Sequence, residues 1–262
     1  MDKKNWRNKK GPVKRRVNSD EMIYGLRPVI EAFDSGKDLE KLFIQKGLQG
    51  DLAKEINQKA KNSGTPMSRV PSEKLGQFTG KNHQGVVGFL SPVKYYTVEN
   101  LVQRLYDSGR SPLIIVLDRI TDVRNFGAIA RTAECMGADG IIIPSQNAAQ
   151  VNADSLKTSV GALHTIPVCR PEDLGSSLKY LQDSGVQIVS CTEKSNTNLS
   201  DCAFDIPTAI IMGSEEVGIS EDLISMSDAQ VKIPLLGNIK SLNVSVAAGM
   251  ILYEINRQRG YT

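Results

Sequence analysis

The chain has 262 residues, 40% of them hydrophobic, and a net charge of only +3, a composition typical of a globular protein with one large domain or two small ones. No apolar run approaches the length of a membrane-spanning helix, and the N-terminus lacks the apolar core of a secretory signal, so we expect a cytoplasmic protein without a membrane partner. The four cysteines form no C-x-x-C pair and are expected to be reduced. The two histidines, His83 and His164, are too few and too distant in sequence to favour a metal site.

The positive charge is concentrated at the N-terminus. Residues 1–19 contain eight lysines and arginines against one aspartate, a charge of +7, which leaves −4 for the rest of the chain. Such a run is typical of a disordered arm that binds nucleic acid. A solubilising tail without a partner is the alternative.

The segment that follows predicts a small α/β unit over residues 20–91. We interpret residues 92–112 as a polar linker with one helix over 98–105, and we place the domain boundary there. Within the small unit, helices are expected over residues 22–33, 51–61 and 72–78, and strands over residues 41–45, 67–70 and 85–90.

From residue 113 the pattern changes to continuous apolar strands separated by helices. This pattern is typical of an α/β domain with a buried parallel sheet. The expected strands cover residues 113–117, 140–143, 187–190, 209–212 and 230–233, and the expected helices cover residues 127–136, 153–162 and 173–183.

The last helix is apolar on two sides and follows a polar loop that contains Gly237. A surface helix would show one apolar stripe, so two partners are implied. One is the core of the subunit and the other is a second subunit. The first face comprises Val244, Ala247, Ala248, Ile251, Leu252 and Ile255, and the second comprises Val246, Met250 and Tyr253.

Three polar loops follow predicted strands, at residues 118–132, 211–219 and 233–243. The chain lacks a P-loop, a G-x-G-x-x-G turn after a strand and a G-x-S-x-G elbow, so the common nucleotide and hydrolase folds find no support. Because ligands bind at the carboxyl ends of strands in an open sheet, we expect the three loops to converge there.

Each polar residue of these loops also has an ordinary structural explanation. Polar side chains are common at helix ends, where they cap the backbone or interact with the helix dipole. The alternatives are a helix cap for Asn125 with a tight turn at Gly127, a solvated surface position for Arg131, a contact with the helix start near Glu221 for Glu215, and an N-cap at Ser241 or Asn243.

The three loops closely resemble the three motifs of the SpoU family, the knotted ribose 2′-O RNA methyltransferases of the SPOUT superfamily. Residues 125–132 resemble N-[FL]-G-x-x-x-R-[ST], residues 213–218 resemble G-x-E-x-x-G, and residues 233–247 resemble I-P-[ML]-x-G-x-x-x-S-L-N-V-S-V-A. Residues 22–25 and 82–87 are similar to the beginning and end of the family's RNA-binding domain. The resemblance therefore covers nearly the whole chain after residue 20.

The resemblance implies a fold and a cofactor. The fold is a methyltransferase domain over residues 113–262, with a parallel sheet and a deep trefoil knot, preceded by a small ribosomal-protein-like RNA-binding domain. The cofactor is S-adenosylmethionine, with Gly213, Ile233 and Leu242 as its contacts. An apolar or absent side chain at these positions leaves backbone donors and acceptors free to bind the adenine edge.

The resemblance also assigns the reacting groups. The sulfonium methyl is already activated, so the enzyme mainly has to hold a ribose 2′-hydroxyl in line with it. The resemblance implies that Arg131 accepts or shares the proton of the 2′-hydroxyl. Because a guanidinium stays protonated in proteins, we treat Arg131 as a phosphate or hydroxyl anchor first and as a base second. Asn125 and Asn243 would orient Arg131 or the RNA, Ser241 would bond the same loop, and Glu215 would fix the loop electrostatically.

The expected substrate is ribosomal RNA. Within the family the chain is most similar to the bacterial methylases of a guanosine in 23S ribosomal RNA, which implies a homodimer whose linker lets the RNA-binding domain swing toward the methyl site. A transfer-RNA 2′-O-methyltransferase and a catalytically silent RNA-binding factor are the alternatives. Two departures, Glu216 where many relatives have glycine and Leu235 where methionine is common, leave the target nucleotide open.

Overall fold

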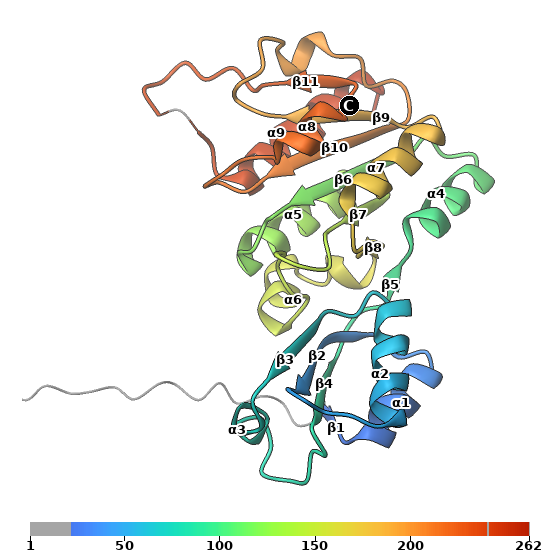
Figure 1. Cartoon of the computed structure of the whole chain (residues 1–262). Coiled ribbons are helices and arrows are strands. Elements are labelled where there is room, and N and C mark those ends of the chain that lie inside the picture. The colour runs from blue at the N-terminus through green and yellow to red at the C-terminus, as the bar shows by residue number, and fades with distance from the viewer. Residues whose placement is uncertain (1–21, 240, 262) are drawn as a thin grey trace, which may run out of the picture.

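The computed structural model describes residues 22–239 and 241–261. The basic segment predicted over residues 1–19 lies outside the described residues. The described chain forms two sheets, a four-stranded one with the order β1-β4-β2-β3 and a seven-stranded one with the order β11-β9-β10-β6-β7-β8-β5. Figure 1 shows them as a small N-terminal unit and a larger C-terminal unit, connected where β5 lies.

The N-terminal unit is a mixed sheet with two helices on one face. β4 pairs antiparallel with β1 and β2, and β3 pairs parallel with β2. Leu42 and Ile44 of β2 pack with Ile56 of α2 in a core of their own, separate from the cores of the larger sheet. The elements are β1 (Met22–Tyr24), α1 (Leu26–Asp34), β2 (Leu39–Gln45), α2 (Asp51–Asn62), β3 (Met67–Val70), α3 (Ser72–Gly76) and β4 (Val86–Leu90).

The helix expected over residues 22–33 begins later than the sequence indicated. Met22 and Tyr24 belong to a strand and pair with Phe89 and Val87 of β4. Gly25 then adopts a φ of 96°, in the left-handed region that favours glycine, and α1 starts after it. The prediction was wrong for this first turn because three apolar residues fit either period.

The larger sheet is parallel throughout. Every pair of neighbouring strands in it runs in the same direction. The five strands expected here are confirmed, whereas β5 and β8 were missed because two residues are too few for a periodic pattern. The strands are β5 (Tyr95–Tyr96), β6 (Leu113–Asp118), β7 (Gly140–Ile142), β8 (Val168–Cys169), β9 (Gln187–Cys191), β10 (Thr208–Gly213) and β11 (Ala229–Val231).

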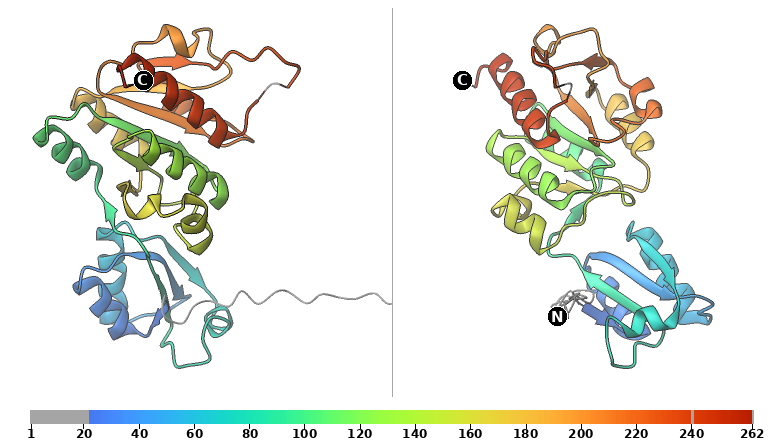
Figure 2. Two further views of the ribbon diagram at one scale, coloured as in Figure 1. Left: turned by 180° about the vertical axis from the view of Figure 1, so that it is seen from behind. Right: turned by 90° about the vertical axis from the view of Figure 1, so that its left-hand side faces the viewer.

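Helices cover both faces of this sheet, with α5, α6 and α9 on one face and α4, α7 and α8 on the other (Figure 2). Ile115 of β6 packs in the core with Phe126 of α5. The next residue, Val116, packs in the opposite core with Leu178 of α7. Burial on both faces explains the continuous apolar runs. The helices are α4 (Val98–Asp107), α5 (Val123–Cys135), α6 (Ala153–Ser159), α7 (Leu174–Asp183), α8 (Glu221–Ser225) and α9 (Val244–Gln258).

Residues 92–112, interpreted from the sequence as a linker, are packed in the structure. β5 extends the larger sheet by pairing with β8, and α4 buries Leu101 and Leu105 against that sheet. The segment is thus held more tightly than its polar composition indicates.

The trefoil knot stays a prediction. Within residues 22–239 and 241–261, no helix combines the length and the apolar character needed to cross a membrane.

Candidate active site

The three motif loops meet at the carboxyl edge of the parallel sheet. Gly213, the last residue of β10, is paired with Asp118, the last residue of β6, so the loops that follow these strands start side by side. The start of α9 joins them through hydrogen bonds from Asn243 to Asn125 and to Glu215. The expected convergence of the three loops is therefore confirmed.

Asn125, Glu215 and Asn243 form a hydrogen-bonded polar triad. The Asn243 Nδ2 donates to Glu215 Oε1 at 2.7 Å and to Asn125 Oδ1 at 3.0 Å. The Asn125 Nδ2 donates to the same Glu215 Oε1 at 3.1 Å, and the backbone amide of Val244 reaches it at 3.3 Å. One carboxylate oxygen thus gathers three donors, and hydrogen bonds to a charged acceptor are stronger than neutral ones.

Asn243 is also the N-cap of α9. Its Oδ1 accepts the backbone amide of Ser245 at 3.0 Å and the Ser245 hydroxyl at 2.5 Å. The side-chain oxygen of Asn243 therefore caps the helix, while its nitrogen donates to Asn125 and Glu215. These bonds determine the orientation of the amide. Of the two N-caps considered from the sequence, Asn243 is confirmed and Ser241 is wrong.

Asn125 is not a helix cap. The cap of α5 is Asp122, whose Oδ1 accepts the Asn125 amide at 3.1 Å, and the helix begins at Val123. Gly127 lies inside the helix instead of in a turn. A Cβ at Gly127 would lie 2.7 Å from the carbonyl oxygen of Ser155, so glycine is needed for the close approach of α5 and α6.

Arg131 is an exposed cation in α5. Within the part of the chain that the structure describes, its guanidinium makes no hydrogen bond or ion pair, not even to Asn125 or Asn243. The solvated position considered from the sequence fits this geometry. The same geometry leaves all five N–H donors free for an anionic ligand.

A cavity of about 310 Å³ adjoins the triad. Its lining includes Gly213, Ile233 and Leu242, the three residues expected to bind a cofactor, together with Ser241 and Glu215. The volume is at the low end of the range for small-molecule sites, about 300–1,000 Å³. The structure therefore brings seven of the eight predicted site residues together in the triad or the cavity lining, and the exposed Arg131 belongs to neither group.

Gly213 forms part of the cavity wall because the loop after it folds back on β10. The amide of Gly218 donates to the Ser214 carbonyl at 2.9 Å. A Cβ on Gly213 would lie only 2.1 Å from the carbonyl carbon of Gly218. The sequence explained this glycine by open backbone groups, and the structure adds that no side chain fits.

Two residues missed as site residues hold this loop in place. Asp118 is buried and accepts both the backbone amide of Ser220 at 2.7 Å and its hydroxyl at 2.8 Å. Arg119 has a φ of 57° and donates from Nη2 to the Gly218 carbonyl at 3.2 Å. The available signal is an Asp-Arg pair at the end of an otherwise apolar strand.

Two of the four cysteines, Cys169 and Cys191, are unsuited to act as nucleophiles. All four are free thiols. Burial raises the pKa of Cys191, which lines the cavity, to about 12, and burial also raises the pKa of Cys169 to about 12. Because the thiolate is the reactive form, both stay inert at neutral pH. The free thiols agree with the expectation that the cysteines are reduced.

The fold and the site define a class of protein, an α/β protein with a cavity at the carboxyl edge of a parallel sheet, beside a polar triad. The model of the SpoU rRNA methylase family matches residues 112–253, and that of an RNA 2′-O ribose methyltransferase substrate-binding domain matches residues 22–96. The chain belongs to the SpoU rRNA methylase family. The resemblance drawn from the three motifs is thereby confirmed.

Relatives and solved structures agree with this membership. The chain is 34% identical over 240 residues to a protein of Staphylococcus haemolyticus assigned to the TrmH family of tRNA/rRNA methyltransferases, which covers 92% of this chain and 96% of the relative. A Bacillus subtilis protein assigned to the same family is 31% identical over 91% of this chain and 96% of its own length.

Two solved structures are similar in fold over most of the chain. The SpoU methyltransferase AviRb of Streptomyces viridochromogenes, in complex with AdoMet, superposes with a TM-score of 0.59 at 25% identity over 92% of this chain and 91% of its own. An AdoMet-bound rRNA methyltransferase of Sinorhizobium meliloti gives 0.58 at 25% identity over 90% and 86%. The chain is thus an RNA methyltransferase of the SpoU/TrmH type.

Proposed function

We propose that the protein transfers a methyl group from S-adenosylmethionine to a ribose 2′-hydroxyl of RNA. The observation that carries the proposal is the convergence of Asn125, Glu215 and Asn243 beside a cavity lined by Gly213 and Leu242. These residues come from three separate loops. A ligand in the cavity would lie next to the triad.

The residues present fit S-adenosylmethionine. The close fold of the loop over Gly213 leaves the wall without side chains there, while Ile233 and Leu242 supply apolar surface. Such a cavity suits a flat base bound through backbone groups and apolar contact. When bound, the cofactor supplies an activated methyl on a sulfonium centre.

The chain's own residues then have to position the RNA. Arg131 is free to hold a phosphate or the reacting hydroxyl, because no described residue engages its guanidinium. Asn125 and Asn243 are oriented by Glu215 and present fixed amides beside the cavity. Preorganised groups of this kind accelerate a transfer by holding the reactants in line.

Ribosomal RNA is the substrate we propose, with a guanosine of the 23S molecule as the target. The support is the N-terminal unit, since a substrate-binding model matches residues 22–96. A TrmH/SpoU tRNA modifying enzyme of A. aeolicus, at 28% identity and a TM-score of 0.54, aligns with only 63% of this chain but 85% of its own. A transfer-RNA enzyme therefore stays the second candidate and a silent RNA-binding factor the third.

We also propose a homodimer through the C-terminal unit. The second apolar face of α9 is exposed in the single chain, with Val246, Met250 and Tyr253 at 53%, 45% and 56% exposure. These residues follow one another at helical spacing and would be covered by a second copy.

We keep residues 20–91 as the RNA-binding domain, residues 92–112 as the connection and residues 113–262 as the knotted methyltransferase domain.

The basic segment of residues 1–19 would add affinity through RNA phosphates, because counterion release favours binding of cationic segments. RNA substrates of this kind are found in the cytoplasm, where we expect the protein to act.

The proposal is tested by incubating the protein with S-adenosylmethionine labelled in its methyl group and with separated fractions of 23S RNA, 16S RNA and transfer RNA. Label in the 23S fraction alone supports it. Label in transfer RNA favours the second candidate, and label in no fraction favours the silent factor.

A further inference from the structure

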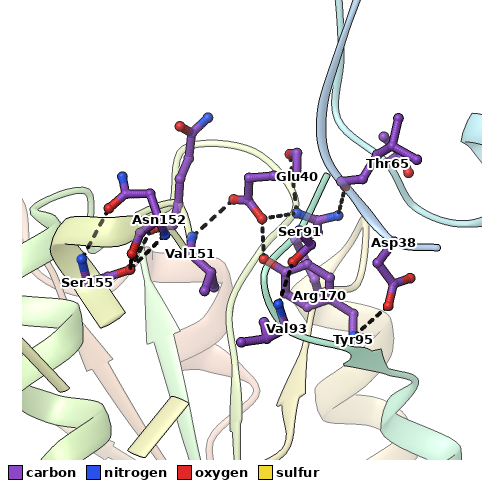
Figure 3. Close-up of polar contacts among 12 residues, drawn as sticks. Asp38, Glu40, Thr65, Ser91, Val93, Tyr95, Val151, Asn152, Ser155 and Arg170 are labelled. Carbon is purple, nitrogen blue, oxygen red and sulfur yellow. Dashed lines mark hydrogen bonds and ion pairs between the residues drawn. The ribbon is translucent and has the colours of Figure 1, made fainter. Parts of the chain in front are cut away.

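A buried ion pair joins the two units. Glu40 lies in β2 of the N-terminal unit, and Arg170 directly follows β8 of the C-terminal unit, 130 residues later. The Arg170 Nη1 lies 3.1 Å from Glu40 Oε2, and the two side chains are only 6% and 9% exposed. Figure 3 shows the pair at the junction, surrounded by groups from both units.

Both oxygens of the Glu40 carboxylate are engaged by the C-terminal unit. The Tyr95 hydroxyl of β5 donates to Oε2 at 2.5 Å, and the backbone amide of Val151 donates to Oε1 at 3.1 Å (Figure 3). Arg170 in turn donates from Nη2 to the carbonyl of Leu39 at 2.7 Å, and its guanidinium lies 3.8 Å from the centre of the Tyr95 ring. A further hydrogen bond joins β5 to the residue before β2, since the backbone amide of Tyr95 donates to Asp38 Oδ2 at 3.0 Å.

Such a pair specifies an orientation more than it adds stability. Taking two charges out of water is costly, and the cost is offset only where the geometry satisfies every donor and acceptor. A small rotation of one unit against the other would separate Glu40 from Tyr95, Val151 and Arg170 together. The junction therefore favours one arrangement of the two units.

Packed groups connect this junction to the candidate active site. Val151 precedes the cap of α6, where Asn152 and Ser155 form a reciprocal capping box (Figure 3). The Ser155 carbonyl lies directly against Gly127 of α5. α5 carries Arg131, so the orientation of the N-terminal unit is set relative to the helix that holds this residue.

We propose that Glu40 is a positioning residue that fixes the N-terminal unit relative to the methyl-transfer site. The two units then bind a folded RNA as one rigid surface, and the RNA must present its binding feature and its target ribose at a fixed separation. A fixed orientation differs from the swinging RNA-binding domain expected from the sequence. This inference rests on the proposed function. A fixed orientation favours binding because a preorganised surface loses less entropy when the RNA binds.

The first test measures the distance between the units. Spin labels are placed on native Cys135, an exposed residue of α5, and on Lys54→Cys in α2, in protein diluted with unlabelled protein so that a dimer carries one labelled subunit. The wild-type background should give one narrow distance distribution. Glu40→Ala should broaden it, and so should Tyr95→Phe, a mild change that removes only the hydroxyl.

The control is Arg110→Gln, which breaks the ion pair with the buried Asp139 inside the C-terminal unit, at 2.6 Å. This variant should keep the narrow distribution. A narrow distribution in Glu40→Ala and in Tyr95→Phe would overturn the proposal, as would the same broadening in the Arg110 control.

The second test separates positioning from a general structural effect. With 23S RNA as the probe, Glu40→Ala should raise the KM for RNA about tenfold while the affinity for S-adenosylmethionine changes by less than about twofold. An unchanged KM for RNA in a variant with a broadened distribution would overturn the proposal. Failure of the proposed function has a different signature, since the wild-type protein would then transfer no methyl group to any RNA fraction.

Discussion

Asn243 donates its side-chain amide to Glu215 at 2.7 Å, although the two residues belong to different motif loops and are 28 residues apart in sequence. The same side chain caps α9 with its oxygen. Asn243 therefore couples the start of α9 to the loop after β10, which lines the cavity. This contact is the basis of the first prediction.

Asn243→Ala should reduce methyl transfer by about 100-fold and reduce the affinity for S-adenosylmethionine much less, because the amide is expected to orient the RNA or Arg131. It should also lower the free energy of unfolding by about 1 kcal/mol through loss of the cap. Asn243→Ser is the control, since serine keeps a capping oxygen and loses the amide donor. Single-turnover kinetics and calorimetric titration measure the two effects. Equal losses of turnover and cofactor affinity would place Asn243 in the cofactor site instead.

Arg131→Ala should lower methyl transfer by about 100-fold with little change in stability, because the side chain is exposed and has no partner among the described residues. Arg131→Lys should recover only part of the activity, since lysine keeps the charge but loses the planar fork. Lys179→Ala, in α7 on the opposite face of the sheet, is the control. If Arg131→Ala transfers methyl groups at a near-normal rate with unchanged RNA affinity, the catalytic assignment is wrong.

Gly213→Ala should weaken binding of S-adenosylmethionine by more than about tenfold, because a Cβ there would meet the backbone of Gly218 at 2.1 Å and displace the loop. Calorimetric titration with S-adenosylmethionine gives the affinity. Gly76→Ala is the matched control, since a Cβ at Gly76 has no heavy atom within 4 Å. Unaltered cofactor binding in Gly213→Ala would mean that this loop does not form the cofactor site.

Met250→Glu should convert the dimer to a monomer, because a charge would be buried in the middle of the second apolar face of α9. Sedimentation velocity reports the mass directly. Leu52→Glu, at a similarly exposed apolar position of α2, should leave the mass unchanged. The dimer proposal is wrong if the wild-type protein sediments as a monomer or if Met250→Glu stays dimeric.

The parts of the fold that could be predicted from the sequence are those with a long periodic signal. The strand that became β6 was found because both of its faces are buried, so Leu113 to Leu117 form an unbroken apolar run. β5 and β8 have two residues each and give no such signal. The sequence predicts a helix where β1 forms, because its three residues fit both periods and the turn at Gly25 depends on a backbone angle.

The candidate site shows the same limit. The sequence indicates which loops are polar and, through the family motifs, which residues are expected to act in the site, but not how these residues contact one another. The hydrogen bond between Asn243 and Asn125 joins residues 118 positions apart. Asp122 caps α5, so the helix begins before Asn125 and not at residue 127 as predicted. Glu40 and Arg170 are ordinary residues in the sequence, and only their burial at one junction distinguishes them.

The central claim is that the three loops form one site for methyl transfer to a ribose 2′-hydroxyl. The most direct measurement is mass spectrometry of the nucleosides released from RNA after reaction with deuterium-labelled S-adenosylmethionine. The account predicts that all label appears in 2′-O-methylated nucleosides with the wild-type protein and that Asn243→Ala yields about 100-fold less of the same product. Label on a base, or no label in any RNA, would contradict it.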